Sequence, residues 1–245
     1  MKLPISLIAC SLLAASSVFA VQGTTSPYTD AIGDIDPGIS TGDGTLDIVG
    51  MEVSNTLTDV IFKLTVNGNV STTDWGRFMI GISTGKTAGT TTGNGWGRPI
   101  NLSSPNAGMD HWVGSWIDGG GSSELYSYNG TAWVGPASPV SFTFSAGATS
   151  DITATLSLAS LGLSLSDTFY FDAYSSGGGG SDSAIDSLAN PNVAVTTWAG
   201  PYTSSTTGGG GNGLNSYQVV PEPSTYLLSA LGVLAIYFFA RRRKA

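Results

Sequence analysis

The sequence predicts an all-β protein, with residues 21–202 forming a two-sheet β-sandwich of jelly-roll type. Charged residues make up only 11% of the chain, and 34 of its 245 residues are Gly. That composition suits short strands and turns better than helices. From Leu46 onward, apolar and polar residues alternate with a period of two, which indicates strands with one buried face. About eight to ten such strands would bury their apolar faces between two sheets.

The first 20 residues have the features of a secretory signal peptide. Lys2 supplies the positive charge, residues 7–15 form an apolar core, and Val18-Phe19-Ala20 is a small-residue cleavage site. A lipoprotein interpretation, with Cys10 acylated, leaves too short an apolar core before the cysteine. Since Cys10 is the one cysteine of the chain, the exported part is expected to have neither disulfides nor thiol chemistry.

Alternation places the strands of the sandwich in order. The apolar residues of each run are Val60, Phe62, Leu64 and Val66; Phe78, Ile80 and Ile82; Val140, Phe142 and Phe144; Ile152, Ala154, Leu156 and Leu158; and Phe169, Phe171 and Ala173. Asn129-Gly130 separates two further strand-like runs and predicts a hairpin with a type I′ turn, in which both residues have positive φ. Helical turns are expected only at 158–161 and 183–188.

The composition changes after the predicted sandwich. Residues 203–219 are rich in Ser, Thr, Gly and Asn, and include four consecutive glycines at 208–211. A stretch of this kind has few apolar residues to bury, so we expect a flexible linker.

Three signals stand in series at the end of the chain. Val220-Pro221-Glu222-Pro223 comes first, and the prolines disfavour helix there. The apolar run 226–240 follows, and with two residues before it would span roughly 26 Å as a helix. The basic tail Arg241, Arg242, Arg243 and Lys244 would stay in the cytoplasm and stop transfer. We therefore expect a single C-terminal transmembrane helix.

Together these signals closely resemble the PEP-CTERM sorting signal, which we assign to residues 220–245. The resemblance falls on Val220, Pro221, Glu222, Pro223, Thr225, Leu227, Leu228 and Arg241 to Arg243. It implies processing by an exosortase, a membrane peptidase of Gram-negative bacteria that produce exopolysaccharide. The chain would then cross the inner membrane, be anchored transiently, and reach the cell surface or the extracellular matrix.

Charge argues against one class of partner. Residues 21–220 hold four basic residues against sixteen acidic ones, a formal charge of −12. Such a surface repels nucleic acid, so no nucleic-acid partner is expected.

Five aspartates fall close together before the first clear strand: Asp30, Asp34, Asp36, Asp43 and Asp47. Carboxylate oxygens are the ligands that Ca²⁺ prefers, and a bound ion would relieve their mutual repulsion. The spacing does not fit an EF-hand. A Ca²⁺ site and a solvated acidic loop are both compatible with this pattern.

Tryptophans among polar residues suggest a carbohydrate site. Trp112 and Trp116 would share one face of a strand, about 13 Å apart at ~3.3 Å per residue, and Trp96 precedes them. Their alternative role is to fill the core.

Catalytic motifs are weak in this sequence, and we expect no catalytic residues and no enzyme activity. Gly81-Ile82-Ser83-Thr84-Gly85 matches the G-x-S-x-G pattern, but no helical pattern follows it. The chain has a single histidine, His111. The sequence thus favours a structural or adhesive surface protein associated with exopolysaccharide. A carbohydrate-binding module is the second interpretation, and a glycan-active enzyme is the third.

Overall fold

The computed structural model describes residues 28–137, 141–205, 213–220 and 232. The expected signal peptide at 1–20 lies outside the described residues. So do the residues after Val220, including the apolar run 226–240, apart from Gly232. Within the described part, no helix is both long enough and apolar enough to cross a membrane.

The described part of the chain is built of strands, joined by loops and two 3-10 turns. The strands are β1 (Tyr28–Thr29), β2 (Ile48–Asn55), β3 (Asp59–Val66), β4 (Arg77–Ser83), β5 (Ile100–Ser103), β6 (His111–Trp116), β7 (Ser122–Tyr128), β8 (Trp133–Ala137), β9 (Ser141–Ser145), β10 (Ser150–Ser157), β11 (Thr168–Ser176), β12 (Asp186–Ser187), β13 (Tyr202–Ser205) and β14 (Asn215–Gln218). The turns are η1 (Asp118–Gly120) and η2 (Ala159–Leu161).

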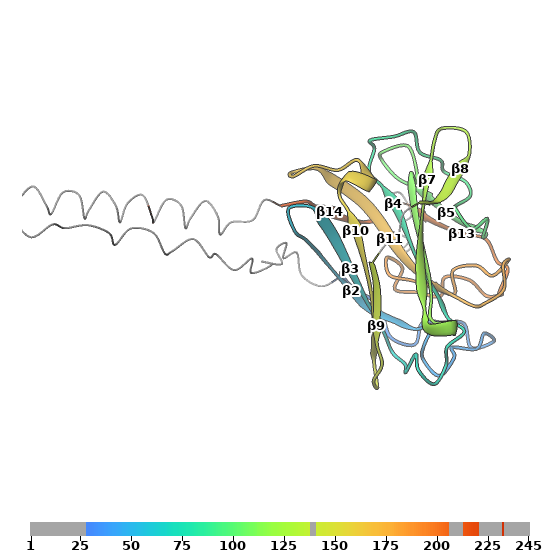
Figure 1. The fold of residues 1–245 in the computed structure, drawn as a ribbon. Coiled ribbons are helices and arrows are strands. Elements are labelled where there is room, and N and C mark those ends of the chain that lie inside the picture. Colours follow the sequence, from blue (N-terminus) through green and yellow to red (C-terminus); the bar gives the residue numbers. More distant parts are fainter. Residues whose placement is uncertain (1–27, 138–140, 206–212, 221–231, 233–245) are drawn as a thin grey trace, which may run out of the picture. The chain divides into compact units, whose positions relative to one another are not determined.

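Two antiparallel sheets face each other. The first has the order β1-β2-β3-β10-β9, and the second has the order β12-β11-β4-β6-β7-β8, with β14 also paired to β11. Figure 1 shows β2, β3, β10 and β9 on one side and the second sheet beside them. The all-β expectation is confirmed, but the jelly-roll order is wrong. A jelly roll sends consecutive strands to alternate sheets, whereas β6, β7 and β8 here pair in sequence.

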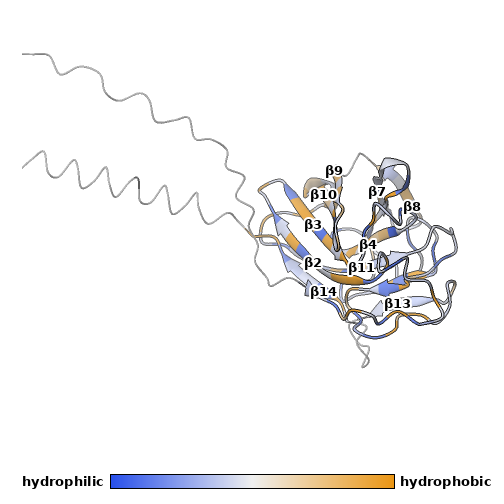
Figure 2. Ribbon diagram, turned by 90° about the horizontal axis from the view of Figure 1, so that it is seen from below, coloured by the Kyte–Doolittle hydropathy of each residue, from blue (hydrophilic) through white to orange (hydrophobic). Residues whose placement is uncertain are grey.

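The main core lies between the two sheets. It joins Phe62 and Leu64 of β3 to Ile80 of β4 and to Phe169 and Phe171 of β11, all nearly or fully buried. Along β3, buried and partly exposed residues alternate without interruption, and Figure 2 shows the matching alternation of hydropathy. The period-two pattern therefore identified the core-facing residues of β3, β4, β10 and β11 correctly. It was wrong for β9, where Phe144 is exposed and Phe142 is only partly buried, and Val140 lies outside the described residues.

The second sheet is buried on both faces at its central strands, β4, β6 and β11. Its outer face carries Met79, Trp112 and Tyr174, which pack against Ile100 of β5 and Tyr202 of β13 in a second hydrophobic cluster. β5 and β13 form a parallel two-stranded ribbon, and with long loops they make a third layer (Figure 1). This layer explains why β4, past its first residue, is buried at every position.

The hairpin of β7 and β8 is confirmed, but its expected turn is wrong. Gly130 has a φ of 93°. The strands pair at Tyr128 and Trp133, however, so four residues connect them rather than two. Asn129 does not have positive φ. Its Oδ1 instead accepts hydrogen bonds from the amides of Thr131 (3.0 Å) and Ala132 (2.9 Å), which stabilises the longer loop.

Two other local expectations are corrected. The helical turn at 158–161 is present as η2, but 183–188 contains β12 in place of a turn. The linker at 203–219 is wrong in its extent, because β13 pairs with β5 and β14 pairs with β11. Tyr217 and Val219 are buried in the main core. Tyr217 and Val219 have the period-two spacing of a strand, but the polar residues around them make this pattern hard to recognise in the sequence.

Candidate functional site

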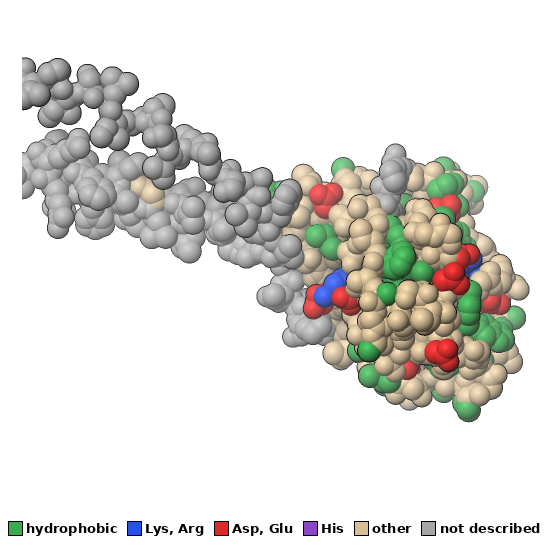
Figure 3. Space-filling model, turned by 60° about the horizontal axis from the view of Figure 1, so that its bottom comes forward, with side chains coloured by type: hydrophobic (Ala, Val, Ile, Leu, Met, Phe, Trp, Pro, Cys, Tyr) green, Lys and Arg blue, Asp and Glu red, His purple; other side chains and the backbone are tan. Residues whose placement is uncertain are grey.

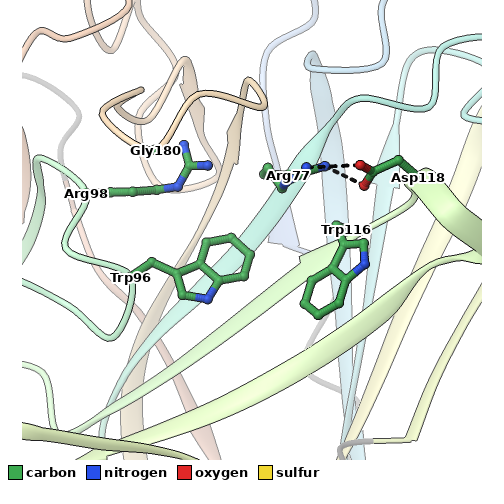
Figure 4. Close-up of a pocket in the computed structure, with 6 residues that line it drawn as sticks. All are labelled: Arg77, Trp96, Arg98, Trp116, Asp118 and Gly180. Carbon is green, nitrogen blue, oxygen red and sulfur yellow. Dashed lines mark hydrogen bonds and ion pairs between the residues drawn. The ribbon is translucent and has the colours of Figure 1, made fainter.

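A pocket on the outer face of the second sheet is the first candidate site. Its lining residues are Arg77, Trp96, Arg98, Trp116, Asp118 and Gly180, and its volume is about 340 Å³. We call it the tryptophan pocket. Figure 4 shows the two guanidinium groups along one side of it and the two indoles along the other.

The tryptophans of this pocket are positioned by β6. Because strand residues alternate, Trp112, Gly114 and Trp116 share one face. Trp96 comes from the loop before β5 and lies over Gly114, where a Cβ atom would overlap its ring. Its ring centroid is 6.4 Å from that of Trp112 and 6.3 Å from that of Trp116. Trp96 therefore fills the space between the Trp112 and Trp116 rings, which is free because Gly114 has no side chain.

The exposure of these rings differs, which corrects the predicted carbohydrate site. Trp112 is fully buried and stacks on Tyr174 with centroids 6.1 Å apart. It cannot stack on a sugar. Trp96 and Trp116 are partly exposed and line the pocket. The three-tryptophan site thus reduces to two, with Trp112 supporting Trp96 from beneath.

Two arginines complete the pocket. Arg77 makes a two-pronged ion pair with Asp118, at 2.7 Å from Nη1 to Oδ1 and 3.2 Å from Nη2 to Oδ2. Arg98 is 5% exposed and lies over the Trp96 ring, with its Cζ 5.4 Å from the ring centroid. Burial lowers the pKa of Arg98 to about 10, against the opposing charge of Asp182. Arg98 still carries its charge at neutral pH.

Three carboxylates form the second candidate site, which we call the carboxylate cluster. Asp30, Asp34 and Asp186 each place an oxygen within 4.8 Å of the others. Asp186 is held by the amides of Ile48 (2.6 Å) and Ser187 (2.7 Å). One oxygen of Asp30 and both oxygens of Asp34 are buried without a hydrogen-bond partner among the described residues.

Charge is unfavourable at this cluster. Burial raises the pKa of Asp30 to about 8, and the nearby charges of Asp34, Asp172 and Asp47 add to the rise. Burial and the charge of Asp30 raise the pKa of Asp186 to about 9. Burial also raises the pKa of Asp34. A divalent cation such as Ca²⁺ takes oxygen ligands and would offset this repulsion, so the residues present fit such an ion.

Only two of the five aspartates expected to bind Ca²⁺ lie in the carboxylate cluster. Asp30 and Asp34 join the carboxylate cluster, but Asp36 and Asp43 are not part of it. Asp36 accepts a hydrogen bond from the Gly38 amide (2.8 Å), and Asp43 is exposed. Asp47 is buried and accepts hydrogen bonds from Gly33 and Asn67. It adds charge near Asp30 but is not a member of the cluster.

Sequence reasoning missed the residues that tertiary structure brings in. Asp186 lies far along the chain from Asp34, and Arg77, Arg98 and Asp118 belong to three different segments. One signal could have found the arginines. The signal is their scarcity: Arg77 and Arg98 are the only arginines among the four basic residues of 21–220.

Ser83 of the G-x-S-x-G match is a buried strand residue. Its Oγ contacts the Gly108 carbonyl and the Ser104 hydroxyl, both at 2.5 Å. Asp110 is buried beside His111. Burial opposes its ionisation, but hydrogen bonds from His111 and Thr84 hold the pKa of Asp110 below its usual range. These contacts account for the pattern without a nucleophile elbow.

The sandwich is described as far as Val220, inside the segment that carries the sorting motif. Asn55 forms hydrogen bonds with both the amide and the carbonyl of Val220. Pro221, Glu222, Pro223, Thr225 and Arg241 to Arg243 lie outside the described residues.

Comparison with known families gives one result. Residues 219–244 match the family model of the PEP-CTERM protein-sorting motif. Neither the curated proteins nor the solved structures contain a match to this chain.

Proposed function

Because the chain carries a PEP-CTERM sorting motif and is thus an exosortase-sorted exported protein, we propose that it is a structural or adhesive component of the cell surface or extracellular matrix, associated with exopolysaccharide. The motif at 219–244 is the observation that carries the proposal. Export would pass through the inner membrane of a Gram-negative bacterium, with transient anchoring by the apolar run 226–240. The proposed role is non-enzymatic.

The test is the mass and location of the mature protein. In cells with a working exosortase, we expect the surface or matrix protein to lack residues 1–20 and the tail that contains Arg241 to Lys244. Glu222→Ala should leave the tail in place, whereas Gln218→Ala, on the exposed side of β14, should not. A mature wild-type protein that keeps Lys244 would refute processing. A processed protein that appears only in the medium, with no polysaccharide bound, would refute the matrix role.

Carbohydrate binding is a second candidate function, and the tryptophan pocket favours it. Two partly exposed indoles beside charged, planar guanidinium groups combine an apolar platform with hydrogen-bond donors. The flat C–H face of a sugar ring packs on such a platform, and its hydroxyl groups need such donors. The site would use Trp96 and Trp116.

Calcium binding is proposed for the carboxylate cluster. The observation that favours it is the set of buried oxygens of Asp30 and Asp34 that lack partners among the described residues. Asp30, Asp34 and Asp186 would hold the ion, and its role would be to join the start of the sandwich to β12. This role concerns stability rather than catalysis.

A further inference from the structure

Basic residues are distributed unevenly over this acidic protein. On the face shown in Figure 3, most of the surface is uncharged and acidic groups are scattered over it. Of the four basic residues in 21–220, Lys63 pairs with Glu52 and Lys86 pairs with Asp167 at the surface. The other two, Arg77 and Arg98, both line the tryptophan pocket.

Arg98 is the unusual member of this set. Within the described part of the chain, it is the basic residue with no carboxylate oxygen within 4.0 Å. Its Nη1 donates to the Ser176 hydroxyl (2.7 Å) and the Asp182 carbonyl (3.0 Å), and its Nη2 donates to the Gly177 carbonyl (3.2 Å). These neutral acceptors fix the guanidinium in place but do not neutralise it. Its remaining N–H groups have no partner among the described residues.

The lining of the pocket is therefore electropositive. Asp118 offsets Arg77 through their ion pair, which leaves the charge of Arg98 uncompensated by any lining residue. The charge of Asp182 acts on Arg98 from a distance, but no carboxylate oxygen pairs with it directly, so an anion that reached the guanidinium would form a charge-assisted hydrogen bond. Glu124, which lies nearby, is not a lining residue, and its Oε2 accepts hydrogen bonds from Trp96 Nε1 (3.1 Å) and the Tyr126 hydroxyl (3.0 Å).

We propose that the tryptophan pocket binds an acidic sugar residue, such as a uronic acid, within a polysaccharide chain. The carboxylate would accept hydrogen bonds from Arg98 and lie near Arg77, while the ring packs on Trp116 and Trp96. An inorganic anion would leave the indole rings of Trp96 and Trp116 without an apolar partner, so it is not the preferred ligand. A neutral sugar would leave the charge of Arg98 without a partner, so it is not preferred either. This inference rests on the carbohydrate-binding function proposed above and specifies its ligand class.

The test is a binding titration of the full-length chain, purified in detergent, with tetragalacturonate. EDTA is present throughout, so that Ca²⁺ cannot bridge protein and ligand. We expect binding by calorimetry, with a change in tryptophan fluorescence. The fully methyl-esterified tetrasaccharide, which has the same rings without the charge, should bind about tenfold more weakly or worse, and sodium acetate should not compete at equal concentration.

Variants locate the site. Trp116→Ala and Arg98→Gln should each weaken tetragalacturonate binding by about tenfold or more. The matched controls are Lys86→Gln, which removes one surface charge, and Trp133→Ala, which removes a partly buried tryptophan outside the pocket; both should bind as the wild type does. If Arg98→Gln fails to fold in a melting control, Trp116→Ala decides the result.

Three outcomes would overturn the proposal: no binding of the acidic tetrasaccharide, equal binding of the esterified form, or unchanged binding by Trp116→Ala. Binding of the neutral form alone would keep the carbohydrate-binding function and reject its acidic ligand. Because the titration does not depend on processing, its failure is also distinct from a failure of exosortase sorting.

Discussion

Asn55 and Val220 are joined by a pair of hydrogen bonds across 165 residues of sequence. Asn55 Nδ2 donates to the Val220 carbonyl at 2.9 Å, and the Val220 amide donates to Asn55 Oδ1 at 3.0 Å. The same Oδ1 accepts a hydrogen bond from the Tyr217 hydroxyl at 2.8 Å. A buried side chain of β2 thus fixes the chain directly before the Pro-Glu-Pro residues of the sorting motif.

We predict that Asn55→Ala lowers the free energy of unfolding by ~2 kcal/mol or more, because it removes the hydrogen bonds that this buried side chain makes with the Tyr217 hydroxyl and with the backbone of Val220. Urea unfolding would measure the change. Gln218→Ala, on the exposed side of β14, should change the free energy of unfolding by no more than about 0.5 kcal/mol. Equal midpoints for the two variants would show that Asn55 does not hold β14 in place.

Gly114→Ala should disrupt the tryptophan pocket. The added Cβ would overlap the Trp96 ring and force it off β6, at a cost of about 1–3 kcal/mol. We expect a lower urea midpoint and a changed tryptophan emission spectrum. Gly180→Ala is the matched control, since it lines the same pocket but its Cβ would meet nothing within 4 Å. An unchanged emission spectrum for Gly114→Ala would contradict the position of Trp96.

Gly130→Val should lower stability by about 1–2 kcal/mol, because φ of 93° at this position strains any β-branched residue. Thr131→Val is the control, because Thr131 lies in the same loop, is already β-branched and does not have positive φ, and we expect this change to be nearly neutral. The comparison is made by urea unfolding. A neutral Gly130→Val would mean that the loop between β7 and β8 has another conformation.

Calcium should raise the melting temperature of the wild type through the carboxylate cluster. At free Ca²⁺ of 100 times Kd, the gain would be ~2.7 kcal/mol. Asp186→Asn should reduce the gain, whereas Asp43→Asn, from the exposed loop, should leave it intact. Differential scanning calorimetry with Ca²⁺ and then with chelator measures it. Identical melting temperatures in the two conditions would reject the site.

The pH dependence in chelator follows from the raised pKa values of Asp30, about 8, and Asp186, about 9. The unfolded carboxyls titrate near pH 4. Since the folded state holds these protons to higher pH, the stability that the protonated groups contribute is fully present below about pH 4 and is lost as pH rises toward 9. Urea midpoints of the wild type should therefore fall between pH 5 and pH 9 by more than those of Asp186→Asn. If the urea midpoints of the wild type and of Asp186→Asn fell equally, the pH dependence would come from groups other than Asp186.

The sequence alone determined the strands whose apolar residues alternate and the sorting motif at the end of the chain. Alternation is a local property of the backbone, so it identified the core faces of β3, β4, β10 and β11 without knowledge of their partners. The sorting motif is likewise contiguous, and its family match confirms it. Even so, alternation does not specify which strands pair, and the jelly-roll order expected from it was wrong.

Only the tertiary structure decided which residues form the candidate sites. Trp112 and Trp116 share a strand face, as their spacing indicated, but the third layer buries one and leaves the other in a pocket. Asp34 lies beside Asp186 because β12 pairs with β11 at the end of the sandwich, next to the start of β2. Burial and proximity depend on contacts between distant segments, and a local pattern carries no information about which segments will meet.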